Sequence, residues 1–598
     1  MSFTKSALFA ANPSTSRGTA TKLSASKEKI VYTNGKAVFI RDISNPALSI
    51  AYNGHVQNTT VARISPTGYY CASADAFGTV RVWDTVGEDK TLKGEFKVIS
   101  GRINDLEWDG ESKRIIAVGD GKEKFGHAFM FDSGTSTGEI IGHSKSINAV
   151  SIRHQRPFRA ATAADDNLIV FHQGAPYKYD KTIKTHSKFV QDVRYAASGD
   201  HFASVGSDGK IFLYDGKVGD TLGDFGDAHK GSIYGISWSP DSKFISTSSA
   251  DTTVKIWDVE TRKPTVTYTL GTGVDHQQVG NVWSAPDIIV SLSMSGDLNV
   301  FDQRSGDKPV KVLYGPQKSV TAATPVSSET FIVGTADGRL LSYDSTGDAA
   351  YISGTGHSNF VSGLAASPDG KVFSAGYDDR IRELSGGEFV QASFTTSAQP
   401  KALAVAADGT AFVVEAGVVE AVRSNQKVTE LKPKSSPSAV AASQDTVAIG
   451  YEDQKIGIFK WDGKSLNAVG TLDGNKGVIS ALAFSPDGSK LAAGDSSGRI
   501  VLFDAKELKA ITSRWSFHTA RILSLHWTSD SEHCASGSLD THVYVWSVQK
   551  PMKNIAIKNA IPGGANAVFW LGHSGGKGKL VGAGADACVR VWEVAFHV

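Results

Sequence analysis

Residues 229–258 read HKGSIYGISWSPDSKFISTSSADTTVKIWD, and no other part of the chain repeats its pattern so clearly. Three runs rich in β-branched and aromatic residues, at 233–238, 244–249 and 254–257, are separated by Ser-Pro-Asp and by a turn at Asp251. Pro presets the backbone at the first corner of a turn, and Asp is favoured in tight turns because its side chain bonds nearby backbone amides. Short runs between turn residues are typical of β-strands. The stretch therefore predicts three consecutive strands joined by tight turns.

Weaker copies of this pattern recur about every forty residues, a period typical of WD repeats, each of which forms one four-stranded blade of a β-propeller. Fourteen copies begin near Arg17, Thr59, Gly101, Ser144, Ser187, Lys230, Asp275, Gln317, Ser358, Ala398, Pro437, Asn475, Thr519 and Ile561. Propellers typically have roughly four to eight blades, so two rings fit these copies better than one. We expect an all-β protein of two tandem seven-bladed WD-repeat propellers, residues 1–315 and 316–598.

The two ends of the chain suggest how the second ring closes. The last copy finishes with a third strand at 589–594, and almost nothing follows it. The first copy, from Arg17 to about Asn53, has all four strands, and the spare apolar segment Ala7-Leu8-Phe9-Ala10 precedes it. We expect residues 7–11 to supply the outer strand of the last blade, because an uncovered sheet edge is a liability.

Composition argues against several classes of function. The 62 basic and 61 acidic residues give a net charge of +1, so general binding to nucleic acid or to an anionic membrane is not expected. The three cysteines lie far apart and form no Cys-x-x-Cys pair, so neither a zinc site nor a redox motif is indicated. The first residues lack the apolar core of a signal peptide, and no apolar run is long enough to cross a bilayer. A cytoplasmic location fits best.

His, Asp and Trp recur at fixed positions and resemble catalytic groups. His229, Asp251 and Trp257 have the same spacing as His518, Asp540 and Trp546. A set that is copied from blade to blade is better explained as a structural hydrogen-bond network within each blade, because an enzyme needs one special constellation. Some copies depart from it: Phe77 stands where the turn Asp is expected in the second copy, and the tenth shows no recognisable network.

Other signatures of catalysis and of cofactor binding are absent from the sequence. There is no phosphate-binding Gly-rich loop with Lys, and no His-Glu-x-x-His motif. Asp297, Asp337 and Asp378 fall in predicted hairpin turns, where Asp is a common residue, so we do not expect a metal site. We expect neither an enzyme nor a cofactor.

One group of loops has more length and charge than a blade requires. The third copy extends its hairpin through residues 119–127, and turns between second and third strands share a face with loops between blades. Residues Glu123, Phe125, Asp165, Lys188 and Phe189 are therefore expected to form one mixed patch, with Lys178 and Tyr179 at its rim. Aromatic residues among both signs of charge suit a protein interface. The alternative is that these are ordinary surface residues, and that Asp165 belongs to the network of its blade with His143 and Phe171.

Along essentially its whole length the chain resembles the actin-interacting protein 1 family of WD-repeat cofilin partners. The resemblance is carried by Ala7-Leu8-Phe9, Ser16-Arg17-Gly18-Thr19, the segment 65–73, the segment 111–115, Phe125-Gly126-His127, the segment 156–159, Asp165-Asp166-Asn167 and Trp515-Ser516-Phe517-His518-Thr519-Ala520. It implies a monomeric, non-enzymatic protein of the actin cytoskeleton that binds cofilin-decorated actin filaments and promotes severing, depolymerisation and barbed-end capping.

The family's filament-binding positions fall on Glu123, Asp165, Lys178, Tyr179 and Phe189, where Tyr179 replaces a Phe. Lys122, Lys124, Phe125 and Lys188 flank them and are candidate supporting contacts. The competing hypothesis is a general WD-repeat scaffold or adaptor for another assembly, which would capture peptides near a central channel without dependence on cofilin.

Overall fold

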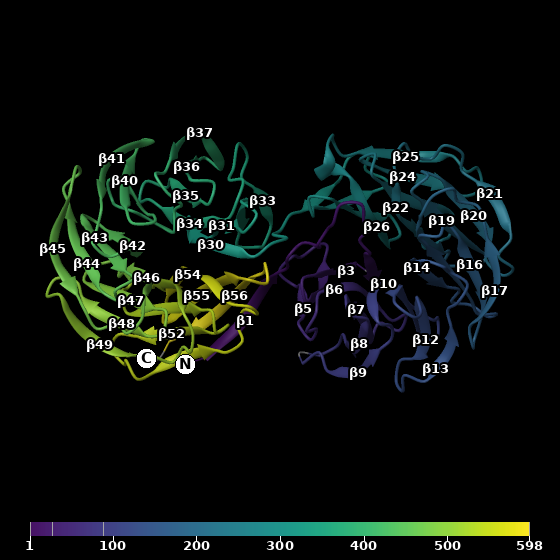
Figure 1. Cartoon of the computed structure of the whole chain (residues 1–598), viewed down its shortest axis with the longest axis horizontal. Helices are drawn as coiled ribbons and strands as arrows, with labels where there is room; N and C mark the ends of the chain where they lie inside the picture. Colours follow the sequence, from purple (N-terminus) through teal and green to yellow (C-terminus); the bar gives the residue numbers. More distant parts are fainter. Residues whose placement is uncertain (1, 27, 88, 597–598) are drawn as a thin grey trace. The chain divides into compact units, whose positions relative to one another are not determined.

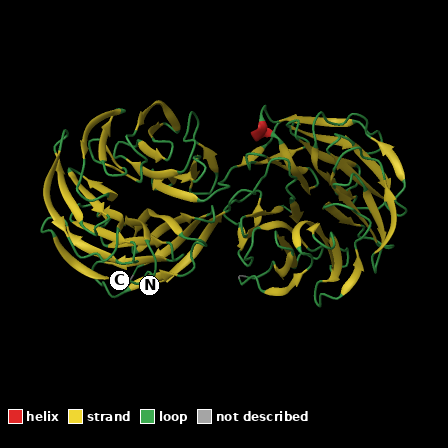
Figure 2. Cartoon of the chain, in the orientation of Figure 1, coloured by secondary structure: helices red, strands yellow, loops and turns green. Residues whose placement is uncertain are grey.

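The computed structural model describes residues 2–26, 28–87 and 89–596. These residues form fourteen four-stranded antiparallel sheets, together with one short 3-10 helix, η1 (Val274–His276). Figures 1 and 2 show an almost entirely β structure. The expected all-β architecture of two tandem seven-bladed propellers is confirmed.

One compact unit comprises Asn12–Asn45 and Ser49–Gln317, and we call it the N-terminal propeller. Its blades 1–7 are, in chain order, β2 (Ser24–Ser26), β3 (Lys29–Asn34), β4 (Ala37–Asp42) and β5 (Ile50–Tyr52); β6 (Thr59–Ile64), β7 (Tyr70–Asp75), β8 (Thr79–Asp84) and β9 (Leu92–Lys97); β10 (Gly101–Trp108), β11 (Arg114–Gly121), β12 (Gly126–Met130) and β13 (Ser136–Glu139); β14 (Ile147–Ile152), β15 (Arg159–Ala164), β16 (Ile169–Gln173) and β17 (Lys178–Ile183); β18 (Val190–Tyr195), β19 (His201–Gly206), β20 (Ile211–Asp215) and β21 (Thr221–Asp224); β22 (Ile233–Trp238), β23 (Phe244–Ser249), β24 (Thr253–Asp258) and β25 (Pro264–Thr269); β26 (Gln278–Ala285), β27 (Ile288–Ser293), β28 (Leu298–Asp302) and β29 (Lys311–Leu313).

The other compact unit comprises the chain up to Ala11, Pro46–Leu48 and the chain from Lys318 onward, and we call it the C-terminal propeller. Its blades 8–14 are β30 (Val320–Pro325), β31 (Thr330–Thr335), β32 (Leu340–Asp344) and β33 (Ala349–Tyr351); β34 (Val361–Ala366), β35 (Val372–Gly376), β36 (Arg380–Ser385) and β37 (Glu388–Thr395); β38 (Ala402–Val405), β39 (Ala411–Val414), β40 (Val419–Arg423) and β41 (Gln426–Leu431); β42 (Pro437–Ser443), β43 (Thr446–Tyr451), β44 (Ile456–Trp461) and β45 (Leu466–Leu472); β46 (Ile479–Phe484), β47 (Lys490–Asp495), β48 (Ile500–Asp504) and β49 (Lys509–Trp515); β50 (Ile522–Trp527), β51 (His533–Ser538), β52 (Val543–Ser547) and β53 (Asn554–Ile557); β54 (Ala565–Ser574), β55 (Lys577–Gly584) and β56 (Val589–Ala595), completed by β1 (Ser2–Phe9).

Each ring closes through its inner strands. The first strand of every sheet contacts the first strand of the next, and β26 returns to β2 just as β54 returns to β30. Apolar side chains of neighbouring sheets pack between the blades; one such cluster joins Val82 of blade 2 to Trp108 and Phe129 of blade 3. The hydrophobic core of each propeller is therefore a series of interblade layers rather than one centre.

Strand β1 is the outer strand of blade 14. It pairs antiparallel with β56, from Ser2 opposite Ala595 to Phe9 opposite Val589. Phe9 is buried and its ring stacks on Tyr343, with centroids 5.8 Å apart. The strand begins earlier than the expected segment 7–11 and ends at Phe9, because an outer strand needs only backbone hydrogen bonds and exposed polar residues supply these equally well.

The compact unit of the N-terminal propeller extends to Gln317. Asn12 joins the start of this propeller to its end: its backbone N–H donates to the Pro316 carbonyl at 2.9 Å and its Nδ2 to the Leu313 carbonyl at 3.0 Å. The Gln317 side chain then donates to the carbonyl of Pro13 at 2.7 Å. These bonds keep Gln317 within the N-terminal propeller.

The His–Asp–Trp sets form structural networks inside single blades. In blade 6, His229 Nδ1 lies 2.9 Å from Asp251, and its Nε2 lies 2.8 Å from the Thr247 hydroxyl. The Trp257 indole donates to the same hydroxyl at 2.9 Å. Blade 13 repeats this arrangement with His518, Asp540, Ser536 and Trp546.

Two blades build the network differently from the sequence expectation. In blade 2 the acid is Asp75, two positions before Phe77, and its carboxylate lies 3.5 Å from His55 Nδ1. In blade 10, where the sequence shows no network, Ala398 N–H donates to Glu415 at 2.6 Å and the Ser397 hydroxyl donates to Glu420 at 2.5 Å. A buried carboxyl pair thus takes the place of His and Asp there.

Candidate functional site

One face of the N-terminal propeller is built from two kinds of loop: the turns after each second strand and the interblade loops. We call it the loop face. In most blades a backbone bond ties the two kinds together; Ala76 N–H donates to the Asn58 carbonyl in blade 2, and Ser207 N–H donates to the Phe189 carbonyl in blade 5. Loops that are held in this way present their side chains in fixed positions.

The extended hairpin of blade 3 places a charged tip on the loop face. Lys122, Glu123 and Lys124 are exposed at its tip, between β11 and β12. The half-buried Phe125 packs against the interblade cluster that contains Ile140, and its carbonyl accepts the Gly119 N–H at 2.7 Å. Phe125 therefore anchors the hairpin and leaves the three charged residues free to face solvent.

Asp165 is not part of the network of blade 4, contrary to one sequence interpretation. His143 Nδ1 bonds both oxygens of Asp166, at 3.1 Å, and its Nε2 bonds Thr162 at 2.9 Å. His172, rather than Phe171, then bonds Thr162 at 3.1 Å. Burial opposes ionisation of Asp166, but the bond from His143 and the backbone N–H groups of Ser144 and Leu168 together outweigh burial and lower its pKa. The network acid stands one residue later than expected.

Asp165 instead faces the neighbouring interblade loop. Its carboxylate accepts from the Asn148 amide at 2.7 Å, and its backbone N–H donates to the Ser146 carbonyl at 3.0 Å. The side chain is half-buried, so one oxygen is fixed while the residue stays accessible at the surface.

Tyr179 and Phe189 are the exposed aromatic residues of this region. They are 45% and 46% exposed. The Tyr179 ring covers Gly142, where an added Cβ would lie 2.9 Å from a ring carbon, and its hydroxyl bonds Thr182 at 3.1 Å. The Lys145 ammonium lies 5.9 Å from the centroid of the Phe189 ring, which is within the range of a cation–π contact.

These contacts converge on residues 140–148, which we call the hub segment. Phe125 packs beside Ile140, Tyr179 covers Gly142, and Phe189 lies under Lys145. Asp165 binds the end of the same segment. Lys178 is exposed but is not brought to the hub, since it pairs with Gln173 at the far end of β16.

The hub segment adds two residues that the sequence reasoning missed. Ile141 is 56% exposed, although its neighbour Ile140 is buried, and Lys145 is exposed beside Phe189. The adjacent isoleucines were a signal, but which of the two faces solvent depends on the course of the loop. The loop face near the hub then carries apolar rings among the exposed charges Lys122, Glu123, Lys124, Lys145 and Lys188.

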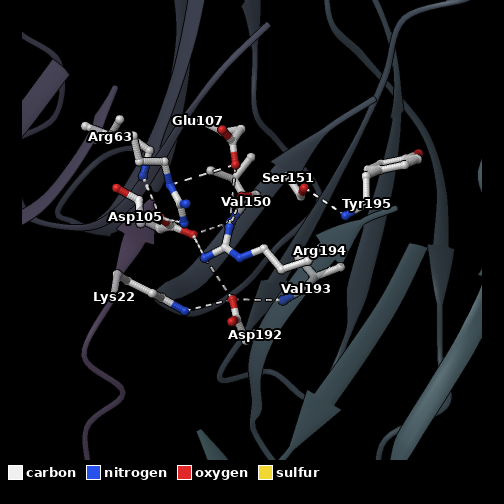
Figure 3. Close-up of polar contacts among 12 residues, drawn as sticks. Lys22, Arg63, Asp105, Glu107, Val150, Ser151, Asp192, Val193, Arg194 and Tyr195 are labelled. Atoms are coloured by element: carbon white, nitrogen blue, oxygen red, sulfur yellow. Dashed lines mark hydrogen bonds and ion pairs between the residues drawn. The ribbon is translucent and has the colours of Figure 1, made fainter. Parts of the chain in front are cut away.

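The central channel of the N-terminal propeller holds the other concentration of charge. It has a volume of about 510 Å³ and is lined by Lys22, Arg63, Glu107, Asp192 and Arg194, which form one charged cluster with the buried Asp105 (Figure 3). Asp105 is fully buried and accepts from Arg194 at 2.7 Å and from Arg63 at 3.0 Å. Burial opposes ionisation of Asp105, but the positive charges of Arg194, Arg63 and Lys22 together outweigh burial and lower the pKa to about 2.

Every positive group of this channel cluster faces a carboxylate. Lys22 bonds Asp192 at 2.9 Å, and Arg194 also lies 3.0 Å from Asp192. Three cations therefore meet three carboxylates, which leaves no excess charge to attract a ligand. The ion pair between Asp105 and Arg194 connects blade 3 to blade 5 across blade 4, so we interpret the cluster as structural.

Among the described residues no group of His, Cys, Asp or Glu is arranged to hold a metal ion. Cys71, Cys534 and Cys588 are buried, and burial raises the pKa of each thiol. No described helix combines the length and apolarity that a membrane span requires.

Family models match parts of the chain. The WD domain, G-beta repeat model matches residues 177–215, 220–258 and 351–382. The Vps8 beta-propeller model matches residues 424–559, which lie in the C-terminal propeller.

Similar proteins match almost the whole chain. Actin-interacting protein 1 of Drosophila melanogaster is 39% identical over 600 residues, which span 98% of this chain and 97% of that protein. Actin-interacting protein 1 of Caenorhabditis elegans is 38% identical over 616 residues, with 99% and 100% covered. WD repeat-containing protein 1 of Gallus gallus is 37% identical over 606 residues, with 99% and 98% covered. The likeness therefore includes both propellers.

Proposed function

The chain belongs to the actin-interacting protein 1 family, and we propose that it binds cofilin-decorated actin filaments and promotes their disassembly. The single observation that supports this most strongly is the full-length similarity to proteins named for interaction with actin. The loop face supplies a surface suited to such a partner, because exposed rings lie among charges of both signs.

We propose that the contact is made through Glu123, Asp165, Tyr179 and Phe189 around the hub segment, with Lys178 at the outer edge of blade 4. Lys122, Lys124 and Lys188 surround these residues with positive charge, and Phe125 holds the hairpin in place. Aromatic side chains contribute the larger part of the binding energy in such interfaces, and charges fix the orientation. We extend the contact to Ile141 and Lys145 because both lie beside these rings.

The mechanism proposed is binding without a chemical reaction. A protein that binds the cofilin-altered filament more tightly than the bare filament shifts the population toward the altered and severed states. Binding at newly exposed barbed ends would then slow re-annealing and growth. A propeller suits this task because backbone bonds hold the loops of its loop face together before a partner binds. On this proposal the chain acts as a monomer in the cytoplasm, at the actin cytoskeleton.

Filament sedimentation tests the proposal. Purified full-length protein is mixed with actin filaments, with and without cofilin, and the pelleted actin is measured. We expect a loss of pelletable actin only when both proteins are present. A correctly folded protein that causes no cofilin-dependent loss would contradict the proposal and favour a general scaffold.

A further inference from the structure

Blade 2 carries two exposed apolar side chains on the loop face that the contact proposed above leaves unused. Phe77, in the turn between β7 and β8, is 59% exposed, and Val56, in the loop before β6, is 66% exposed. The turn and the loop touch, since Ala76 N–H donates to the Asn58 carbonyl at 2.9 Å. An apolar pair of this kind gains free energy when a partner covers it.

The hydrogen-bond network of blade 2 does not use position 77, so the Phe77 side chain is left at the surface. In blade 6 the network acid follows its histidine by 22 residues, from His229 to Asp251, and the same spacing in blade 2 leads from His55 to Phe77. Asp75 performs the structural task from inside the strand: its carboxylate faces His55 and accepts the N–H groups of Phe77 at 2.9 Å and Thr79 at 3.1 Å. Position 77 is thereby left out of the network, whose acid is Asp75, with a carboxylate oxygen 3.5 Å from His55 Nδ1.

The turn is also held rigid. His55 Nε2 and the Trp83 indole both bond the Ser73 hydroxyl, at 2.7 and 3.1 Å. The Lys97 ammonium donates to the Phe77 carbonyl, so the backbone of the turn is fixed from both sides. An exposed aromatic residue on a fixed turn loses little conformational entropy on binding.

The blade 2 pair is continuous with the hairpin of blade 3. Val98 N–H donates to the Gly78 carbonyl at 2.9 Å, and Lys122 N–H donates to the Ser100 carbonyl at 3.2 Å. The segment 98–100 thus joins the Phe77 turn to the tip that carries Glu123. One partner that covers Glu123 has the Phe77 turn beside it.

We propose that Val56 and Phe77 form an apolar extension of the filament-binding surface, which seats an apolar area of the same cofilin-decorated filament. The extension rests on the proposed function. It makes the contact surface run from blade 2 to the loop before blade 5, with an apolar end at blade 2 and a charged centre around the hub segment.

The test is binding of full-length variants to cofilin-decorated actin filaments, measured by the protein that pellets with them. We expect the double variant Val56→Ser/Phe77→Ser to bind about five- to thirtyfold more weakly than wild type. Phe77→Leu keeps an apolar side chain and should bind within about twofold of wild type. Tyr69→Ser is the matched control, because Tyr69 is 63% exposed in the same blade but at the opposite end of β7.

The outcomes separate the two proposals. Unchanged binding of the double variant, with wild type bound, overturns the extension and leaves the proposed function standing. Absence of wild-type binding overturns both. Equal loss in Tyr69→Ser would also contradict the extension. If the double variant melts at a lower temperature than wild type, the binding of the single variant Val56→Ser is measured instead. Binding of Val56→Ser equal to that of wild type would then overturn the extension.

Discussion

The two propellers share a fold but fill their central channels differently. The channel of the N-terminal propeller is lined by the charged residues Lys22, Asp192 and Arg194, which pair with one another and with the buried Asp105. The C-terminal channel, of about 440 Å³, is lined by small and apolar residues such as Ala323, Ala365, Ala404 and Ala441, and none of its described lining residues is Asp, Glu, Lys or Arg. The inner wall of the ring therefore carries cross-blade ion pairs in one unit and closely packed small side chains in the other.

The residues of the inner strands that line the channel therefore differ between the two units, although both units have the same four-stranded blades. Contacts between neighbouring inner strands and packing between the blades are present in both units. Buried ion pairs add little net stability over apolar packing, but loss of one partner is costly because it leaves a buried charge unpaired. The two channels should consequently respond to substitution in different ways.

Asp105→Asn should produce the largest change. The substitution removes the carboxylate shared by Arg63 and Arg194 and should destabilise the N-terminal propeller by about 3–5 kcal/mol. Chemical denaturation measures the effect, and Asp132→Asn, at an exposed position after β12, is the matched control. Equal stability of the two variants would show that the ion pairs of Asp105 contribute nothing to the free energy of unfolding.

Gly363→Ala tests the close packing of the C-terminal channel. A Cβ at Gly363 would lie 2.9 Å from the Leu403 Cβ on the next inner strand, so the blades must move apart. We expect a loss of about 1–3 kcal/mol. Gly572→Ala has open space around it and should be neutral by the same denaturation measurement. The packing account is wrong if both variants behave alike.

Glu415→Gln tests the buried carboxyl pair of blade 10 in the C-terminal propeller, which Glu415 forms with Glu420. Burial, and then the hydrogen bond with Glu420, raise the pKa of Glu415 from 4.5 to about 8. Between these values the unfolded chain loses a proton that the folded chain keeps, so the free energy of unfolding falls as pH rises. Above about pH 8 it stops falling.

The Gln variant cannot lose this proton. Relative to wild type it should therefore gain about 1–3 kcal/mol between pH 5 and pH 8, or a few degrees in melting temperature. Thermal unfolding at several pH values measures the difference between the two proteins. A difference that does not change with pH would show that Glu415 is ionised in the folded state.

The blade architecture is predictable from sequence because each repeat carries its own turn signals, as at Ser239-Pro240-Asp241. Contacts between blades are not. Arg194 and Asp105 are 89 positions apart, and nothing local to either residue pairs them. Which residue of a turn acts as the network acid is equally hard to predict. Asp165 and Asp166 both suit the position, and only the orientation of the His143 ring, which bonds Asp166, distinguishes them.

The candidate site was predictable to the level of its loops. Charge and length single out the hairpin tip at Glu123, and spacing places Phe189 beside its blade's histidine. Their convergence on the hub segment follows from the packing of Phe125 and Tyr179 against it, which depends on how neighbouring blades meet.

Charge reversal at the hairpin tip should have the smallest effect on stability and the largest on function. Glu123 is exposed, so Glu123→Lys should change the free energy of unfolding by less than about 0.5 kcal/mol. Glu260→Lys, in the exposed turn between β24 and β25, is the matched control. Circular dichroism melting checks that both variants fold as wild type does.

The most direct measurement is the severing rate of single cofilin-decorated actin filaments, observed by fluorescence microscopy, with wild type, Glu123→Lys, Phe189→Ala and Glu260→Lys. We predict that Glu260→Lys severs like wild type, whereas Glu123→Lys and Phe189→Ala each sever at least about tenfold more slowly. Wild-type severing by folded Glu123→Lys and Phe189→Ala would contradict the assignment of the loop face as the filament-binding surface.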